Sequence, residues 1–250
     1  MADQKIHFIP LESDPSIFTD LIRVLGVHSL EFRDVLSLDV ADLVPTGSHC
    51  ALPGLIYAFI LIFPTSKTYE AELAAAKRLA RAEGTQYIGA GRALAEPVIW
   101  FEQTIHNACG LYAILHAISN LGPASSTYID SISLLGSFLE SCIELNPTER
   151  AQALEASPSI AEAYRHAAMQ GGTAVPNAKD EVDFHYVCFV KSPLNGHLYE
   201  MDGDRDGPMD RHDSLEGDDD LLSGGLKLAK SFIQDGNPNF QLMALVPTSL

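Results

Sequence analysis

QTIHNACGLYAILHAISN, residues 103–120, joins a polar stretch to an apolar helical pattern. The pattern covers residues 108–120 and predicts a helix with Cys109 at its N-terminus. A thiol reacts as the thiolate, which a helix N-terminus or a neighbouring histidine stabilises. Gln103 offers a side-chain amide for an oxyanion, and Gly110 would leave room for a substrate backbone. Cys109 is therefore a candidate nucleophile, although a free cysteine is more commonly just a small buried residue.

Apolar runs of two kinds lie on both sides of this stretch. Runs rich in β-branched and aromatic residues predict strands at residues 57–63, 182–190, 197–202 and 240–246. Helical spacing, often bounded by Pro, Asp or Gly, predicts helices at residues 15–25, 69–83, 133–142, 147–154 and 221–234. The sequence therefore predicts a mixed α/β (α+β) domain.

Two of the predicted strands are expected to form a hairpin, because residues 191–196, which connect them, end in Asn195-Gly196. On its first strand, His185 shares a face with Asp183 and Val187, and Asp202 ends the second strand. His185 and Asp202 are thus candidate neighbours. Nine histidines compete for the role of a base, and a buried core histidine is the more common explanation from the residues alone.

Residues 156–179 lose the helical period and collect small residues, two adjacent glycines and two prolines. We expect a long irregular connection here, and long loops inside compact domains tend to be functional or disordered.

The composition is that of one folded domain spanning residues 1–250, with 46% hydrophobic and 20% charged residues and no repeat or long linker. Sixteen Lys and Arg against 33 Asp and Glu leave a net charge of −17, which argues against a nucleic-acid partner. A basic protein or peptide suits this charge better, although the charge could also serve only solubility.

The four cysteines, Cys50, Cys109, Cys142 and Cys188, form no CxxC pair, and the N-terminus lacks the layout of a signal peptide. We therefore expect reduced thiols in the cytoplasm or the nucleus. The longest apolar run, residues 51–63, is too short to cross a bilayer. No HExxH motif or compact His/Cys cluster suggests a metal.

The segment 103–110, QTIHNACG, closely resembles the active-site segment of the ubiquitin C-terminal hydrolases, cysteine peptidases that release adducts from the C-terminus of ubiquitin. Other segments resemble the same family in the same order: residues 8–15 (FIPLESDP), 61–64 (LIFP), 146–150 (NPTER), 182–185 (VDFH) and 197–203 (HLYEMDG). The resemblance therefore covers nearly the whole chain.

This resemblance implies a role for each catalytic position. Cys109 would be the nucleophile, His185 the base, Asp202 the carboxylate that orients the base, and Gln103 the oxyanion-stabilising amide. A weaker match implies that an N-terminal segment touches ubiquitin, namely Pro10, Leu11 and Glu12. No metal or organic cofactor is expected.

The resemblance also implies a papain-like fold, with a central antiparallel sheet flanked by helices and a crossover loop above the active site. That loop should lie in residues 156–179 and restrict the enzyme to small or flexible adducts. We expect a monomer whose partner is ubiquitin, or a ubiquitin-like protein such as Nedd8, with no membrane association. The acidic surface would suit the basic tail of ubiquitin.

Two departures from the family pattern stand out. Residues 49–56 look like an insertion, and Asp204-Arg205-Asp206 replaces a more basic and apolar continuation. We expect neither to touch the catalytic set. A catalytically idle ubiquitin-binding protein and a papain-like hydrolase of another substrate remain as alternatives.

Overall fold

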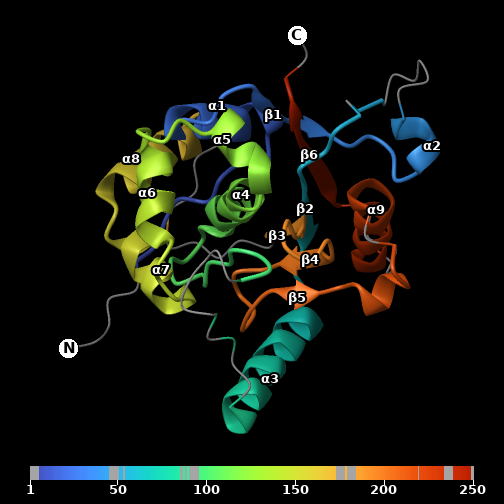
Figure 1. Ribbon diagram of the computed structural model, residues 1–250. Coiled ribbons are helices and arrows are strands. Elements are labelled where there is room, and N and C mark those ends of the chain that lie inside the picture. The colour runs from blue at the N-terminus through green and yellow to red at the C-terminus, as the bar shows by residue number, and fades with distance from the viewer. Residues whose placement is uncertain are drawn as a thin grey trace.

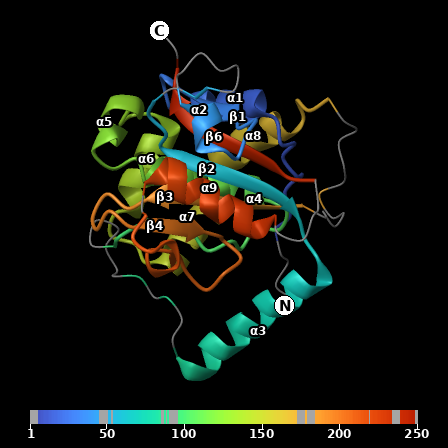
Figure 2. The same ribbon diagram turned by 90° about the vertical axis from the view of Figure 1, so that its right-hand side faces the viewer.

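A six-stranded antiparallel sheet forms the centre of the described part of the chain (Figures 1 and 2). The computed structural model describes residues 6–44, 51–52, 54–84, 87, 89, 96–172, 178, 184–218, 220–233 and 239–248. The sheet has the order β1-β6-β2-β3-β4-β5. Its strands are β1 (Leu30–Asp34), β2 (Ala58–Pro64), β3 (Phe184–Lys191), β4 (Leu198–Met201), β5 (Met209–Asp210) and β6 (Gln241–Pro247).

Helices cover both faces of this sheet. They are α1 (Pro15–Leu25), α2 (Val40–Leu43), α3 (Lys67–Glu83), α4 (Cys109–Ser119), α5 (Ser125–Tyr128), α6 (Leu134–Cys142), α7 (Pro147–Glu155), α8 (Pro158–Ala168) and α9 (Leu221–Phe232), with short 3-10 turns at Gly122–Ala124 and Asp213–Leu215. Figure 1 shows α1 and α4–α8 on one side of the sheet and α2 and α9 on the other. The central antiparallel sheet flanked by helices confirms the predicted fold class.

Strand β2 is apolar along its whole length because it is buried on both faces. Its alternate side chains enter two separate hydrophobic clusters, Ile60 on the α4 side and Leu61 on the α9 side. Antiparallel pairing with β3 places Phe63 opposite His185. Continuous apolar runs of this kind are typical of strands covered on both faces.

The predicted hairpin of β3 and β4 is confirmed, with Cys188 opposite Met201. The connection is a six-residue loop in which the Ser192 amide donates to the His197 carbonyl. Gly196 has a φ of 78° in this loop. The left-handed conformation explains the glycine, because a Cβ is unfavourable there.

Helix α4 is hydrophobic all round, and each of its residues from Cys109 to Ile118 is buried. It packs against β3 and β2. A helix without a polar face is stable only inside a core. The start of α4, and with it Cys109, is therefore placed by packing on every side.

The predicted limits of α1 are also confirmed. The Asp14 side chain accepts a hydrogen bond from the Ser16 amide, Pro15 is the first helical residue, and Gly26 ends the helix at a φ of 102°. These are the usual signals for the start and the end of a helix.

The prediction of one irregular connection over residues 156–179 was wrong for its first half. Residues Pro158–Ala168 form α8, whose first turn is capped by the Ser157 side chain. The proline that suggested a loop stands at the start of the helix, where its missing N–H costs nothing. Residues 173–177 and 179, where the rest of the predicted crossover loop falls, lie outside the described residues.

The insertion at residues 49–56 is described in part. Leu52 is buried and joins the cluster on the α9 side, and its amide donates to the Leu43 carbonyl. Residues 49, 50 and 53 lie outside the described residues.

Helix α3 projects from the body of the molecule in both views (Figures 1 and 2). None of its described side chains is fully buried. Within the described residues, no helix combines the length and the apolar character needed to span a membrane.

Candidate active site

Cys109 is the first residue of α4, as the sequence predicted. The turn before it is folded onto the helix by the Tyr112 hydroxyl, which accepts hydrogen bonds from the Thr104 amide at 3.2 Å and the Ile105 amide at 3.4 Å. The first N–H groups of a helix have no partner within the helix and carry a partial positive charge. The sulfur of Cys109 therefore lies where a negative charge is favoured.

In the chain segment just before Cys109, Asn107 has a left-handed backbone conformation, with a φ of 60°. Asparagine adopts this conformation more readily than most residues. Its side-chain amide donates to the Ala178 carbonyl at 2.9 Å, and its carbonyl accepts from the Tyr164 hydroxyl at 3.4 Å. Asn107 thus reverses the chain just before the helix that carries Cys109.

His185 and Asp202 lie together, His185 near the start of β3 and Asp202 just after β4. His185 Nε2 is 2.8 Å from Asp202 Oδ1. The two side chains are 7% and 0% exposed. Strand pairing brings the two residues together, because β3 and β4 are neighbours in the sheet.

The charges in this pair reinforce each other. Burial alone would raise the pKa of Asp202, but the charge of His185 and its hydrogen bond lower that pKa to about 2. Burial alone would lower the pKa of His185, but Asp202 and then Cys109 raise it well above the usual range. A carboxylate, an imidazolium and the Cys109 sulfur therefore form one interacting group.

Gln103 is held against the segment that follows β4. Its backbone N–H donates to the Gly203 carbonyl at 2.8 Å, and Trp100 Nε1 donates to the Asp202 carbonyl at 3.0 Å. A Cβ on Gly203 would lie 2.9 Å from the Gln103 Cβ, so this close approach requires glycine. The Gln103 side-chain oxygen is buried without a partner among the described residues.

The interpretation of Gly110 as room for a substrate backbone was wrong. A Cβ there would meet the Leu11 Cβ at 3.2 Å, so Leu11 takes up the space. Leu11 is buried, and its carbonyl accepts a hydrogen bond from the Tyr186 hydroxyl. Pro10 and Glu12, on either side of it, are partly exposed. A contact of these three residues with ubiquitin stays a prediction.

The expectation that neither departure touches the catalytic set was wrong for two residues of the second departure, Asp204 and Arg205. The Asp204 amide donates to Asp202 Oδ1 at 2.9 Å. The Asp204 carboxylate also lies 3.9 Å from His185 Nδ1. Arg205 Nε is 3.6 Å from Asp202 Oδ2. The acidic continuation follows Asp202 directly, so sequence proximity was the signal that could have revealed this.

Sequence reasoning missed Tyr69, whose hydroxyl donates to Asp202 Oδ2 at 3.0 Å. It lies in the first turn of α3, a helix that the sequence presents only as a solvent-facing element. No motif links a tyrosine at residue 69 to an aspartate at residue 202.

The remaining cysteines of the described part are structural. Cys142 and Cys188 are buried and unpaired. Burial raises the pKa of Cys142 to about 11 and that of Cys188 well above the usual value. Both thiols therefore stay protonated near neutral pH. Cys50 lies outside the described residues.

A cysteine at a buried helix N-terminus and a buried His-Asp pair on a neighbouring sheet define a papain-like thiol hydrolase as the class of protein. A family model described as "Ubiquitin carboxyl-terminal hydrolase, family 1" matches residues 8–234. The chain belongs to this family of cysteine-type ubiquitin hydrolases.

Similar proteins from several organisms support the assignment. The chain is 30% identical over 245 residues to ubiquitin carboxyl-terminal hydrolase 3 of Arabidopsis thaliana, covering 96% of this chain and 94% of the relative. It is 30% identical to isozyme L1 of Monodelphis domestica, covering 94% and 96%. The crystal structure of the Trichinella spiralis UCH37 catalytic domain bound to ubiquitin vinyl methyl ester has the same fold, with a TM-score of 0.66, 23% identity and coverage of 97% and 96%.

Proposed function

We propose that the protein cleaves small or flexible adducts from the C-terminal glycine of ubiquitin through Cys109, His185 and Asp202. One observation carries the proposal. The imidazole of His185 is hydrogen-bonded at 2.8 Å to the buried carboxylate of Asp202, and it interacts with the sulfur of Cys109 at the start of helix α4. This arrangement places an oriented imidazole beside the thiol that it would activate.

The reaction would proceed in two steps. The Cys109 thiolate attacks the carbonyl carbon of the terminal glycine and forms a C–S bond, and the oxyanion is stabilised by Gln103 and the Cys109 amide. The C–N or C–O bond then breaks, and the leaving group takes its proton from His185. Water, deprotonated by His185, attacks the thioester, and the C–S bond breaks. Ubiquitin leaves as a carboxylic acid that gives its proton to solvent, and the Cys109 thiolate is restored beside protonated His185.

Asp202 has a defined part in this cycle. Because its pKa is about 2, it stays ionised at neutral pH and accepts a hydrogen bond from the Nε2–H of His185. This hydrogen bond keeps the imidazole in the tautomer whose Nδ1 exchanges a proton with the reacting atoms. Asp202 orients His185 without itself giving up or taking a proton.

The test compares the wild type with Cys109→Ala on ubiquitin that carries a fluorogenic C-terminal amide, under reducing conditions. Cys142→Ala serves as the matched control, because Cys142 is also a buried free thiol but has no histidine partner among the described residues. We expect rapid release by the wild type and the control, and none by Cys109→Ala. Ubiquitin binding without Cys109-dependent release would instead indicate an idle binder.

A covalent probe separates ubiquitin from other substrates. The Trichinella spiralis relative was solved with ubiquitin vinyl methyl ester bound. We expect the same reagent to add one ubiquitin to the wild type and none to Cys109→Ala, as read by mass spectrometry. A thiol that reacts with iodoacetamide but ignores this probe and its Nedd8 counterpart would point to a different substrate.

The limit on adduct size is tested with linear fusions at the ubiquitin C-terminus. A short unstructured peptide should be removed much faster than a stably folded domain, and unfolding that domain should restore cleavage. Equal rates for the folded and unfolded fusions would contradict a restricted entrance.

The proposal extends to the oligomeric state and the location of the protein. We propose a monomer, which sedimentation would test, and reduced thiols in the cytoplasm or nucleus, which cell fractionation would test.

A further inference from the structure

The two oxygens of the buried Asp202 carboxylate have different partners. Oδ1 accepts from His185 at 2.8 Å and from the Asp204 amide at 2.9 Å. Oδ2 accepts from the Tyr69 hydroxyl at 3.0 Å and lies 3.6 Å from Arg205 Nε. In the described part of the chain, Tyr69 is therefore the donor within hydrogen-bond distance of Oδ2.

Tyr69 must be the donor in this bond. Asp202 is ionised and can only accept, and burial followed by the charge of Asp202 raises the pKa of Tyr69 far above neutral pH. A hydrogen bond from a neutral phenol to a buried carboxylate is one of the stronger kinds in proteins.

The ring of Tyr69 covers the catalytic pair. It lies edge-on to Phe63, with ring centroids 5.3 Å apart, and 6.0 Å from the ring of His185. Phe63 is opposite His185 in the pairing of β2 with β3. Tyr69 thus packs beside His185 while its hydroxyl donates to the carboxylate of Asp202.

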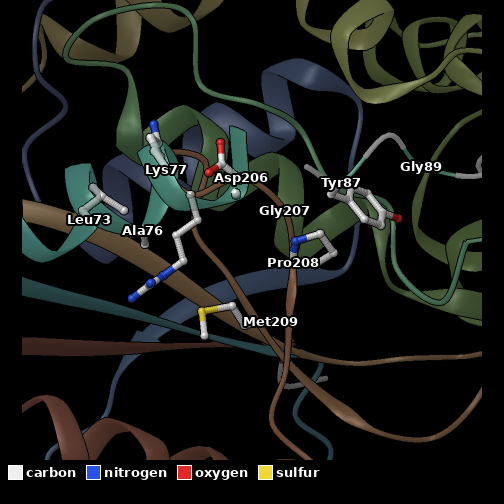
Figure 3. Close-up of a pocket in the computed structure, with 11 residues that line it drawn as sticks. Leu73, Ala76, Lys77, Tyr87, Gly89, Asp206, Gly207, Pro208 and Met209 are labelled. Atoms are coloured by element: carbon white, nitrogen blue, oxygen red, sulfur yellow. The ribbon is translucent and has the colours of Figure 1, made fainter. Parts of the chain in front are cut away.

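Helix α3 packs into the core near its N-terminus. Of its described residues, Tyr69 packs against a hydrophobic cluster. Further along the helix, a groove of about 550 Å³ separates α3 from residues 205–209 (Figure 3). Figure 3 shows Leu73, Ala76 and Lys77 on the helix side and Pro208 and Met209 on the other. The end of α3 that packs into the core is thus the end that meets Asp202.

We propose that Tyr69 is a positioning residue for catalysis, which fixes the rotamer of Asp202 and, through it, the orientation of His185. The inference rests on the proposed function of His185 and Asp202. Without the hydroxyl, Oδ2 would keep, among the described residues, only the ion pair with Arg205, and the carboxylate could rotate away from Nε2.

The experiment compares Tyr69→Phe with the wild type in steady-state hydrolysis of the fluorogenic ubiquitin substrate. Tyr199→Phe is the matched control, since the Tyr199 hydroxyl also donates to a carboxylate, Asp210, at 3.0 Å. We expect Tyr69→Phe to lower kcat about 10-fold with KM within about twofold. The control should keep both constants near those of the wild type.

A spectroscopic readout tests whether the effect passes through the catalytic pair. Proton NMR should show a low-field imidazole N–H resonance that Asp202→Asn removes and thereby identifies. Tyr69→Phe should shift or broaden this resonance, and Tyr199→Phe should leave it in place. An unchanged kcat, or a lower kcat with an unchanged resonance, would overturn the proposal.

The two proposals can fail separately. If the wild type shows no Cys109-dependent release of fluorophore, the proposed function fails. The imidazole N–H resonance would still report whether the Tyr69 hydroxyl positions the Asp202 carboxylate. If the wild type is active and Tyr69→Phe matches it in both readouts, only the role of Tyr69 is wrong.

Discussion

His116 is a buried histidine of helix α4 that contacts the segment leading to the active site. It is fully buried in α4, and its Nε2 accepts a hydrogen bond from the Phe101 amide, just upstream of Gln103. Burial lowers its pKa to about 4 from an ordinary 6.5. His116 is therefore neutral in the folded protein at any pH near neutrality.

This depressed pKa predicts a loss of stability in mild acid. The unfolded state binds a proton to His116 at higher pH than the folded state does, so its contribution is complete above pH 6.5 and is lost as the pH falls towards 4. The full effect is about 3 kcal/mol. Urea unfolding at pH 7.5 and 4.5 should show a smaller drop for His116→Gln than for the wild type. Equal drops would contradict this account.

Asn107 offers a second test at this scale, because its φ of 60° lies directly upstream of Cys109. Asn107→Gly keeps the conformation accessible, whereas Asn107→Val places a β-branched residue in the left-handed region and should cost about 1–3 kcal/mol. Both variants lose the side-chain bond to Ala178. Denaturant titration should therefore show Asn107→Val as clearly less stable than Asn107→Gly, and similar values would rule out a backbone role.

Among the elements, α7 is tied to the active site through a buried ion pair. Arg150 Nη2 lies 2.5 Å from Glu96 Oε1, and Nη1 donates to the Trp100 carbonyl at 3.0 Å. Both charged side chains are essentially inaccessible to solvent. The pair therefore fastens α7 to the segment that leads to Gln103 and Cys109.

Breaking this pair should be costly, because it leaves one charge buried without its partner. We expect Arg150→Met to lower the free energy of unfolding by about 3–5 kcal/mol, and the double variant Glu96→Gln/Arg150→Met to recover part of the loss. The exposed pair Arg165–Glu162 on α8 is the matched control. Chemical denaturation should show a far smaller effect for Arg165→Met, and comparable losses at the two sites would refute the argument.

At the scale of the whole molecule, the net charge of −17 should act on substrate encounter rather than on the chemical step. If the basic tail of ubiquitin is drawn to this acidic protein, added salt should raise KM for the ubiquitin substrate and leave kcat nearly unchanged. The rate at which uncharged iodoacetamide alkylates Cys109 provides the control and should not depend on salt. A KM that is constant between low and high ionic strength would mean that the net charge does not attract ubiquitin and serves only solubility.

Local signals were enough to predict much of this molecule. The apolar helix behind Cys109, the hairpin that carries His185 and Asp202, and the capped helix after Asp14 all formed where the sequence placed them. Each depends on periodicity or on turn and capping residues, which act within a few positions. Helix α8 was missed because small residues and a proline resemble a loop when no packing partner is known.

The sequence by itself determined the family, the fold class and the four candidate catalytic positions, because these are written in short motifs and local patterns. Only the tertiary structure decided what surrounds them. It placed Leu11 against Gly110 and set Tyr69, Asp204 and Arg205 around Asp202. The physical reason is that a hydrogen bond between residues 69 and 202 depends on how a projecting helix and a strand end meet in space, which no local pattern encodes.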